Sequence, residues 1–417
     1  MVAARAEPAR LAAASGLLAA ALQFAGALKS LPGLAALPLD LTLLLALPLL
    51  PALALLLLDR AWEIRPILAV PLLAAALLLL WLTLAGSWSS SRLVLAEKLP
   101  QLVLLGPAML LAGLLVGADA ASLRRLCGTV VVIGLLVGAA TAWGVVSGTV
   151  ILGGALGQDP QKLRVQYQLA GLAIACAAGL AALRAMEAQG ARRAGWVAIL
   201  LLLALAVLVP GGRAALLGLL LGAAGAPALL LCLSGRWVAA LGWLGLILGF
   251  GLGGLTVLLA LPGVDLGLRT LERLLGDPAT ATPARLILWR EALRWAAEAT
   301  PWGLGTGGFT LASGSGDDRS LHPHNHALEA LVEGGWPGLL LWLLAFGGGA
   351  VLAARRAWQV APGRAARIAA LTLPVALTAM VSTDLGNRMV WFGLGLLLSL
   401  AMEARPRMPQ GPPCREA

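Results

Sequence analysis

The chain contains three histidines, and all of them lie in the run Leu321-His322-Pro323-His324-Asn325-His326. Asn325 is a helix-capping residue type, and the apolar spacing after it predicts a helix that ends at Gly334-Gly335. His324 is therefore expected at a helix N-terminus, where the positive end of the backbone dipole disfavours imidazolium. A neutral imidazole can act as a general base, so acid–base chemistry is predicted for this segment.

Two acidic residues follow the histidines. Glu329 and Glu333 are four residues apart and share one face of the predicted helix. Glu329 is expected to orient a histidine ring or a sugar hydroxyl. Two alternatives remain open for the histidines: they could bind zinc, which accepts imidazole readily, or they could be incidental to a helix cap. No cysteine and no clear His-x-x-x-His spacing within the predicted helix completes a metal site, so neither a metal nor a cofactor is predicted.

A second candidate segment is the predicted helix that begins at Thr282-Pro283. At about 100° per residue, Arg285 shares a face with apolar residues, namely Trp289, Ala292 and Ala296. An unpaired guanidinium in apolar surroundings is costly, so Arg285 is expected to have an anionic partner. The guanidinium fork suits phosphate because it can bind two oxygens at once, and an ion pair with a carboxylate is the alternative.

The remaining basic candidates differ in their surroundings. Arg290 and Arg294 lie on the opposite, charged face of the same predicted helix, where they are expected to contact water or lipid headgroups. Arg213 follows Pro210-Gly211-Gly212 between two apolar stretches, and a charge there marks a substrate path or an interfacial side chain. The Gly-rich stretch 301–309 could hold an anion through its N–H groups.

Composition determines the class of protein that carries these residues. Hydrophobic residues make up 60% of the chain and charged residues only 12%, against about 25% charged residues in a soluble domain. Apolar stretches of roughly twenty residues follow one another, each long enough to cross a bilayer. The formal charge of +10 does not indicate nucleic-acid binding, because most Lys and Arg residues lie in short loops between these stretches.

The hydropathy pattern predicts an all-α, polytopic transmembrane protein with about 12 spans. The predicted spans are 11–28, 34–58, 67–86, 99–117, 126–150, 164–183, 195–210, 214–233, 237–261, 335–353, 368–383 and 388–403. Seventeen Lys and Arg residues fall in one set of short loops and seven in the other. The positive-inside rule therefore predicts that both termini are cytoplasmic and that the first helix is an uncleaved span.

This orientation divides the chain into four parts. Residues 1–261 would form spans one to nine, and 262–334 would form one large helical loop on the periplasmic side, with all three histidines. Residues 335–403 would form spans ten to twelve. The Pro-rich tail 404–417 is expected to be cytoplasmic and disordered.

These motifs occur in a recognisable order. They are the Gly-Gly-Arg turn at 211–213, the Arg-x-x-x-Trp helix at 285–289, the Gly-rich stretch at 301–309, and His324-Asn325 with Leu328-Glu329, Glu333-Gly334 and Gly338. In this combination the sequence resembles the O-antigen ligase and polysaccharide polymerase superfamily of bacterial inner membranes. The first half resembles that superfamily only as a series of hydrophobic spans.

The resemblance implies a metal-independent, inverting glycosyltransferase of the GT-C-like type, with an undecaprenyl-diphosphate-linked glycan as donor. The acceptor would be the lipid A–core oligosaccharide, and membrane lipids would be the other partners. His324 would deprotonate the acceptor hydroxyl, while Arg213 and Arg285 would hold the diphosphate. Further substrate contacts are expected from Arg290, His322, Asn325, His326, Glu329 and Arg388. Because His322 and His326 flank His324, which ring is the base stays open.

Three other functions remain as alternatives. A polymerase of the same superfamily would use the same donor, and the late position of the single long outer loop favours the ligase. A protein O-oligosaccharyltransferase is a third possibility within the resemblance. An anion or lipid transporter would need charged or broken helices at mid-membrane, and the centres of the predicted spans are almost free of charge.

Overall fold

The structure, a computed structural model, describes residues 3–152, 162–210, 212–260, 270, 278–317 and 321–406. Within these residues, nine helices are long and apolar enough to cross a membrane. Arg10–Gln23 and Arg388–Ala401 are shorter apolar helices. Each predicted span overlaps a helical segment, and the short span 195–210 corresponds to Gly190–Ala206. The predicted all-α, polytopic fold is confirmed.

The first half of the chain alternates long helices with short connecting elements. These are α1 (Ala3–Gln23), α2 (Ala25–Leu28), α3 (Pro32–Ala35), α4 (Leu41–Asp59), β1 (Arg60–Ile64), η1 (Pro66–Leu68), α5 (Ala69–Ala85), η2 (Gly86–Trp88), α6 (Arg92–Pro100), η3 (Gln101–Leu105), α7 (Gly106–Ala118), α8 (Ala120–Val146), β2 (Val150–Leu152), β3 (Leu163–Val165), α9 (Tyr167–Glu187) and α10 (Gly190–Ala206).

The second half contains the elements that carry most of the predicted site. These are α11 (Arg213–Leu220), η4 (Leu221–Gly225), α12 (Ala226–Leu233), α13 (Trp237–Ala260), α15 (Pro278–Glu298), α16 (Phe309–Ala312), α17 (His326–Trp342), η5 (Leu343–Gly347), α18 (Gly348–Ala357), α19 (Pro362–Val381), α20 (Arg388–Leu398), η6 (Ser399–Ala401) and β4 (Met402–Pro406).

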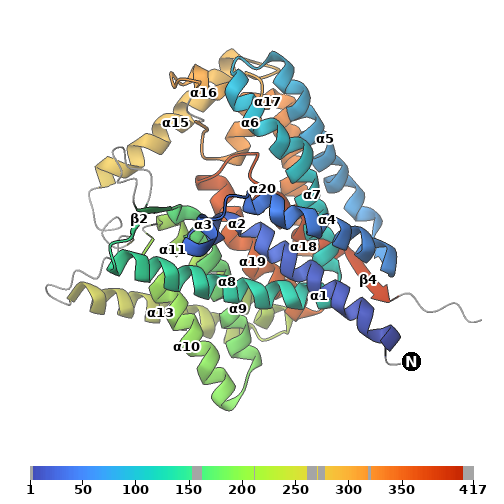
Figure 1. Cartoon of the computed structure of the whole chain (residues 1–417), viewed down its shortest axis with the longest axis vertical. Coiled ribbons are helices and arrows are strands. Elements are labelled where there is room, and N and C mark those ends of the chain that lie inside the picture. The colour runs from blue at the N-terminus through green and yellow to red at the C-terminus, as the bar shows by residue number, and fades with distance from the viewer. Residues whose placement is uncertain are drawn as a thin grey trace, which may run out of the picture.

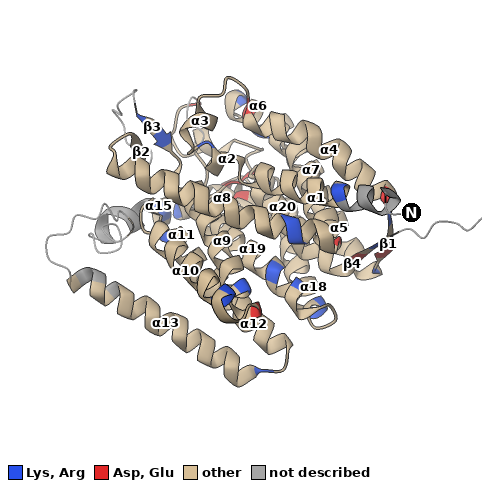
Figure 2. Cartoon of the chain, turned by 60° about the horizontal axis from the view of Figure 1, so that its bottom comes forward, with Lys and Arg blue, Asp and Glu red and all other residues tan. Residues whose placement is uncertain are grey.

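The helices form two parts (Figure 1). The larger part is a bundle in which α8, α9, α10 and α19 lie close together, and α9 is its most enclosed helix. The smaller part, at the top of Figure 1, contains α15, α16 and α6 with the beginning of α17. Charged side chains gather at helix ends and in connections, as Figure 2 shows, which is the distribution expected of helices surrounded by lipid.

The tightest helix pair in the bundle is formed by α7 and α20, which are far apart in sequence. A side chain at Gly113 of α7 would collide with the carbonyl of Phe392, and one at Gly395 of α20 would collide with the carbonyl of Leu110. Small residues let two membrane helices approach at the backbone, where dispersion forces hold them together. Trp391 is completely buried at the start of α20.

A short antiparallel sheet joins the ends of two distant segments. β1 pairs with β4 in the register Arg60↔Pro406 to Ile64↔Met402. Arg60 at the start of β1 forms a buried ion pair with Asp119 at 3.2 Å and a partly buried one with Asp59 at 2.5 Å. The expectation of a disordered tail is therefore wrong for residues 404–406, because their backbone groups pair with β1. Residues 407–417 lie outside the described part of the chain.

One predicted span begins later than expected. The span 34–58 is helical as α4 only from Leu41, because the carboxylate of Asp40 accepts a hydrogen bond from the Thr42 N–H at 2.6 Å and caps the helix there. The predicted spans 368–383 and 388–403 correspond to the helices α19 and α20. A polar turn at 382–387 connects these two helices and becomes part of the site below.

Candidate active site

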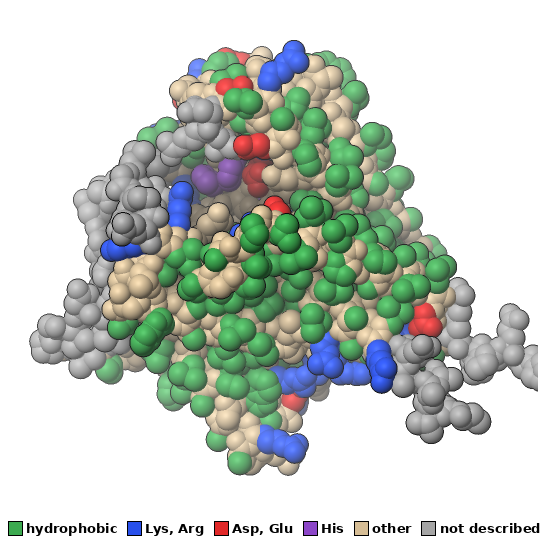
Figure 3. All heavy atoms as spheres, in the orientation of Figure 1, with side chains coloured by type: hydrophobic (Ala, Val, Ile, Leu, Met, Phe, Trp, Pro, Cys, Tyr) green, Lys and Arg blue, Asp and Glu red, His purple; other side chains and the backbone are tan. Residues whose placement is uncertain are grey.

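A hollow opens between the two parts of the molecule. Figure 3 shows histidine side chains inside it and Lys or Arg side chains at its edge. The histidines come from the segment that precedes α17, and the α19–α20 turn lies against this segment. The structure thus brings the predicted histidine motif to a surface recess that a substrate could enter.

The histidine segment is fixed by its helix cap. The Asn325 side chain accepts a hydrogen bond from the Leu328 N–H at 3.0 Å and caps α17, so the predicted helix start is confirmed. His324 lies immediately before the cap and has a φ of 55°. Such a left-handed conformation is uncommon for a residue other than glycine and is typical of functional sites.

Three consecutive side chains hold this segment against the α19–α20 connection. The Asn325 amide donates to the carbonyl of Met380 at 3.1 Å. The Nδ1 of His324 lies 3.4 Å from the carbonyl oxygen of Ser382, and the Nε2 of His326 lies 2.6 Å from that of Asp384. The position of the histidines therefore depends on the position of the 382–384 backbone.

These contacts assign different roles to the three rings. A carbonyl can only accept, so Nδ1 of His324 must carry the proton, and its Nε2 is left with a lone pair. His326 donates from Nε2 and is completely buried. Nδ1 of His322 accepts from the His324 N–H at 3.2 Å, which leaves an N–H at its Nε2. His324 is thus the ring suited to act as a base, and His322 is suited to donate.

Burial keeps both rings of the pair neutral near pH 7. The rings of His322 and His324 lie 4.1 Å apart, centre to centre. Burial lowers the pKa of His322 to about 3, against the opposing charge of Asp384. Burial also lowers the pKa of His324, the Ser382 carbonyl opposes this change, and the charge of Arg285 lowers the pKa further. A neutral base beside a guanidinium is the arrangement that deprotonation of a hydroxyl requires.

Helix α15 has the two faces that the sequence predicted. The Trp289 indole donates to the carbonyl of Pro323 at 2.9 Å, and Ala292 is buried against Phe309 and Val332. Arg285 is half-buried on this face. The opposite face is exposed and carries two of the predicted arginines. Arg290 is exposed there, and Arg294 pairs with Glu291 at 2.5 Å and Glu298 at 3.4 Å.

Arg285 lies within the electrostatic influence of a second arginine, Arg213, which begins helix α11. Burial lowers the pKa of Arg285, Tyr167 opposes this effect, and the like charge of Arg213 lowers the pKa further. Among the described residues, no carboxylate lies within ion-pair distance of Arg285, so the alternative of an Arg–carboxylate pair has no support in this part of the chain. Gly212 packs beside Tyr167, which places Arg213 next to the same tyrosine.

Arg388, another predicted substrate contact, is held by other elements. Its guanidinium donates to the carbonyl of Leu22 at 3.2 Å and to the hydroxyl of Thr42 at 3.1 Å. These partners belong to α1 and α4, so Arg388 connects α20 with the N-terminal helices. These contacts hold the three helices together.

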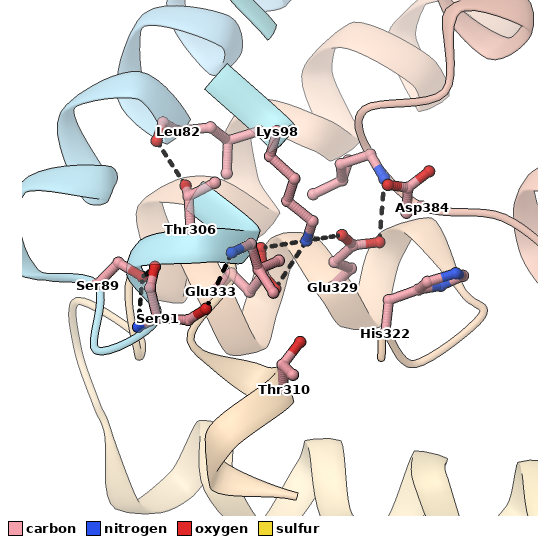
Figure 4. Close-up of polar contacts among 12 residues, drawn as sticks. Leu82, Ser89, Ser91, Lys98, Thr306, Thr310, His322, Glu329, Glu333 and Asp384 are labelled. Carbon is pink, nitrogen blue, oxygen red and sulfur yellow. Dashed lines mark hydrogen bonds and ion pairs between the residues drawn. The ribbon is translucent and has the colours of Figure 1, made fainter. Parts of the chain in front are cut away.

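The two predicted acidic residues bind a lysine instead of a histidine. Lys98 Nζ of α6 lies 2.6 Å from Oε1 of Glu329 and 2.9 Å from both oxygens of Glu333 (Figure 4). The side chains of Lys98, Glu329 and Glu333 are only 4%, 0% and 1% exposed. Oε2 of Glu329 also accepts from the N–H of Leu385 at 3.0 Å. Glu329 therefore reaches the α19–α20 turn.

The Gly-rich stretch supports α17. The N–H of Leu304 donates to the carbonyl of Val332 at 2.8 Å, and that of Gly305 donates to the carbonyl of Glu333 at 3.0 Å. These carbonyls lie just before Gly335, where φ is 66° and the helix is kinked. The Gly334-Gly335 pair thus interrupts the helix as predicted. The N–H groups of Leu304 and Gly305 are used by the protein, so binding of an anion through them, which the sequence allowed, is wrong.

Several site residues were not predicted. The sequence-based predictions give no role to Lys98, Tyr167, Ser382 or Asp384. Lys98 stands beside the predicted span 99–117, and Asp384 stands in the polar run that joins two predicted spans, which is the only local signal for either. Within the described residues, no group of three or more His, Cys, Asp or Glu side chains is placed to hold a metal ion.

The fold and the site together define a polytopic helical membrane protein with a polar recess, in which a neutral histidine lies within the electrostatic influence of Arg285, which in turn lies within that of Arg213. Residues 198–343 match the family model described as O-antigen ligase. The segment that contains these motifs is therefore similar to the O-antigen ligase superfamily, which confirms the resemblance. The matched segment includes Arg213, Arg285 and His324 and ends before α18. No curated protein matches the chain.

Proposed function

We propose that this protein transfers a glycan from a lipid diphosphate, the undecaprenyl diphosphate donor, to a lipid-bound sugar acceptor at the outer surface of the bacterial inner membrane. The family match supports a function in O-antigen ligation or polymerisation. Transfer to the lipid A–core oligosaccharide is the preferred reaction, because the single long polar segment lies late in the chain. A polymerase reaction with the same donor is the alternative that the family match supports equally.

One observation carries this proposal. The lone pair on Nε2 of His324 lies within the electrostatic influence of Arg285, and Arg285 lies within that of Arg213. Two neighbouring guanidinium groups, one of which influences the base, provide the charge that a diphosphate leaving group needs. Nine helices among the described residues are long and apolar enough to cross a membrane, which suits a donor with a lipid tail.

The proposed chemistry follows from these positions. Nε2 of His324 accepts the proton of the acceptor hydroxyl, and the oxygen attacks the anomeric carbon of the donor from the face opposite the phosphate. The bond between that carbon and the phosphate oxygen breaks, which inverts the anomeric centre. The lipid diphosphate leaves with the electron pair, and Arg213 and Arg285 stabilise its additional negative charge.

Purified protein should be tested with lipid-linked glycan and two acceptors. Transfer to lipid A–core with release of the lipid diphosphate supports the ligase. Growth of the glycan on the lipid diphosphate itself supports the polymerase. If neither product forms while the donor binds, glycosyl transfer by this chain is contradicted.

The proposed orientation has a separate test. Both termini would be cytoplasmic and the α15–α17 region periplasmic, as the arginine distribution requires. Reporter fusions at Ser313 and Gly363 should then report opposite sides of the membrane. The same side for both fusions would contradict the orientation and the location of the site.

A further inference from the structure

A buried group of charges lies behind the histidines, and the proposed chemistry does not use it. Lys98, Glu329 and Glu333 form this group, here called the lysine hub. The hub joins two helices. Lys98, its cation among the described residues, belongs to α6, and both carboxylates belong to α17. Figure 4 shows that the lysine points between the two carboxylates, on the side of α17 away from His322.

The hub is connected to the catalytic segment through one atom pair. Oε2 of Glu329 accepts from the N–H of Leu385 at 3.0 Å. The preceding carbonyl, that of Asp384, accepts from His326 at 2.6 Å, and the carbonyl of Ser382 faces Nδ1 of His324. Glu329 thus fixes the same turn whose carbonyls hold the histidine rings.

We infer that Glu329, held by Lys98, is a positioning residue that fixes the 382–385 turn and thereby the tautomer and orientation of His324. This inference rests on the proposed function for His324 as the base. It replaces the expectation that Glu329 contacts the substrate, because both of its oxygens are occupied by protein donors and its side chain is completely buried.

The two carboxylates of the hub differ in a way that allows a sharp test. Glu329 uses its two oxygens for two different donors, Lys98 and the Leu385 N–H. A glutamine has one oxygen and one NH₂ group, so in Glu329→Gln one of these donors must face another donor. Glu333 directs both oxygens to the same Lys98 nitrogen. Glu333→Gln can therefore keep its oxygen on Lys98 and leaves the turn untouched.

A second substitution should rescue the first. In Lys98→Met combined with Glu329→Gln, the lysine donor is absent. The glutamine oxygen can then accept from the Leu385 N–H, and its NH₂ group can donate to Glu333. A role in positioning predicts that this double variant is more active than Glu329→Gln alone. A role limited to holding α6 against α17 by charge predicts that it is no better.

The variants should be compared as purified full-length proteins, with turnover and KM for the lipid-linked donor measured per folded molecule. Glu329→Gln should lower kcat by roughly ten- to a hundredfold with little change in KM, since an unsatisfied buried donor displaces the turn. Glu333→Gln should remain within about threefold of wild type, because its contact needs one acceptor. The double variant should recover most of the loss.

Hydrogen exchange in the 383–387 segment gives a readout that does not depend on activity. It should accelerate in Glu329→Gln, stay near the wild-type rate in Glu333→Gln and slow again in the double variant. Equal losses of kcat in the two single variants, or wild-type kcat despite faster exchange, would overturn the inference. If the wild-type protein transfers no glycan, the proposed function fails, while unchanged exchange in Glu329→Gln would separately refute the link to the turn.

Discussion

The lysine hub and the arginine pair use charge in opposite ways. In the hub, the lysine nitrogen lies 2.6–2.9 Å from oxygens of two carboxylates, and all three side chains are nearly inaccessible to solvent. Arg213 and Arg285 are only half-buried, and each lies within the field of the other's like charge. Opposite charges that are buried together stabilise the packing of the helices that carry them. Like charges at the edge of a recess instead favour binding of an anion. The comparison separates the residues that build the site from those that bind substrate.

The largest effect is expected from replacing His324, the residue proposed to act as the base. His324→Ala removes the ring whose Nδ1 contact with the Ser382 carbonyl leaves Nε2 with a lone pair, which is the proposed base. Transfer should fall by roughly 10²- to 10⁴-fold, the usual contribution of a general base. Transfer to the lipid acceptor should be measured together with donor binding, which should persist because the arginines remain.

His326 provides the contrast for this prediction. His326 is buried and donates to the Asp384 carbonyl, so its replacement should lower stability as well as turnover. Activity of His324→Ala within a few-fold of wild type would shift the role of base to His322. It would also show that the tautomers inferred from the carbonyl contacts are not those of the working enzyme.

The second-largest effect is expected from replacing the two arginines proposed to bind the diphosphate. Arg213→Lys and Arg285→Lys keep the charge but lose the planar fork that binds two phosphate oxygens. Turnover with the lipid-linked donor should fall by about ten- to a hundredfold, as expected for loss of a bidentate, charge-assisted contact. Wild-type turnover in both variants would show that the pair does not hold the diphosphate.

A smaller effect concerns pH. Because burial, with the charge of Arg285, lowers the pKa of His324 below its ordinary value of 6.5, the neutral, active form persists as the pH falls through 6.5. The acid limb of kcat/KM should therefore lie below pH 6.5. Arg285→Gln removes one of the charges that lower this pKa, so in its residual activity the limb should move to higher pH. An acid limb above pH 6.5 in the wild type would contradict the neutral base.

The smallest effect is expected at the exposed face of α15. Arg294 forms ion pairs only with Glu291 and Glu298 among the described residues, and its side chain is 51% exposed. Such solvated pairs contribute little, so Arg294→Lys should leave turnover and KM unchanged. This variant is also the matched control for Arg285→Lys, since both arginines lie on one helix. A large loss in Arg294→Lys would indicate a partner on that face.

Local patterns in the sequence were sufficient to predict the helices and half of the site. Apolar stretches determined the spans, because each one must satisfy its backbone within itself. The capping residue Asn325 predicted the start of α17, and helical spacing separated Arg285 from Arg290 and Arg294. These features depend on residues less than about three turns apart, which a single sequence displays directly.

The hub could not be predicted in this way. Lys98 is adjacent in space to Glu329 and Glu333 but more than two hundred residues away in sequence. Beside an apolar span it looks like an ordinary loop charge. The turn that holds the histidine rings is likewise joined to them by main-chain carbonyls, which leave no trace in side-chain identity. Site residues that are defined by spacing along one helix could therefore be predicted. Site residues that are defined by contacts between distant segments could not.

The close pairing of α7 with α20 has a consequence for biosynthesis. Helix α7 emerges from the ribosome early, and its glycine-lined surface remains without its partner until nearly three hundred further residues have been translated. The 382–387 turn and its carbonyls arrive just before α20. The recess is therefore assembled only when α20 joins α7, so a nascent chain that has already entered the membrane would remain inactive until α20 has been translated.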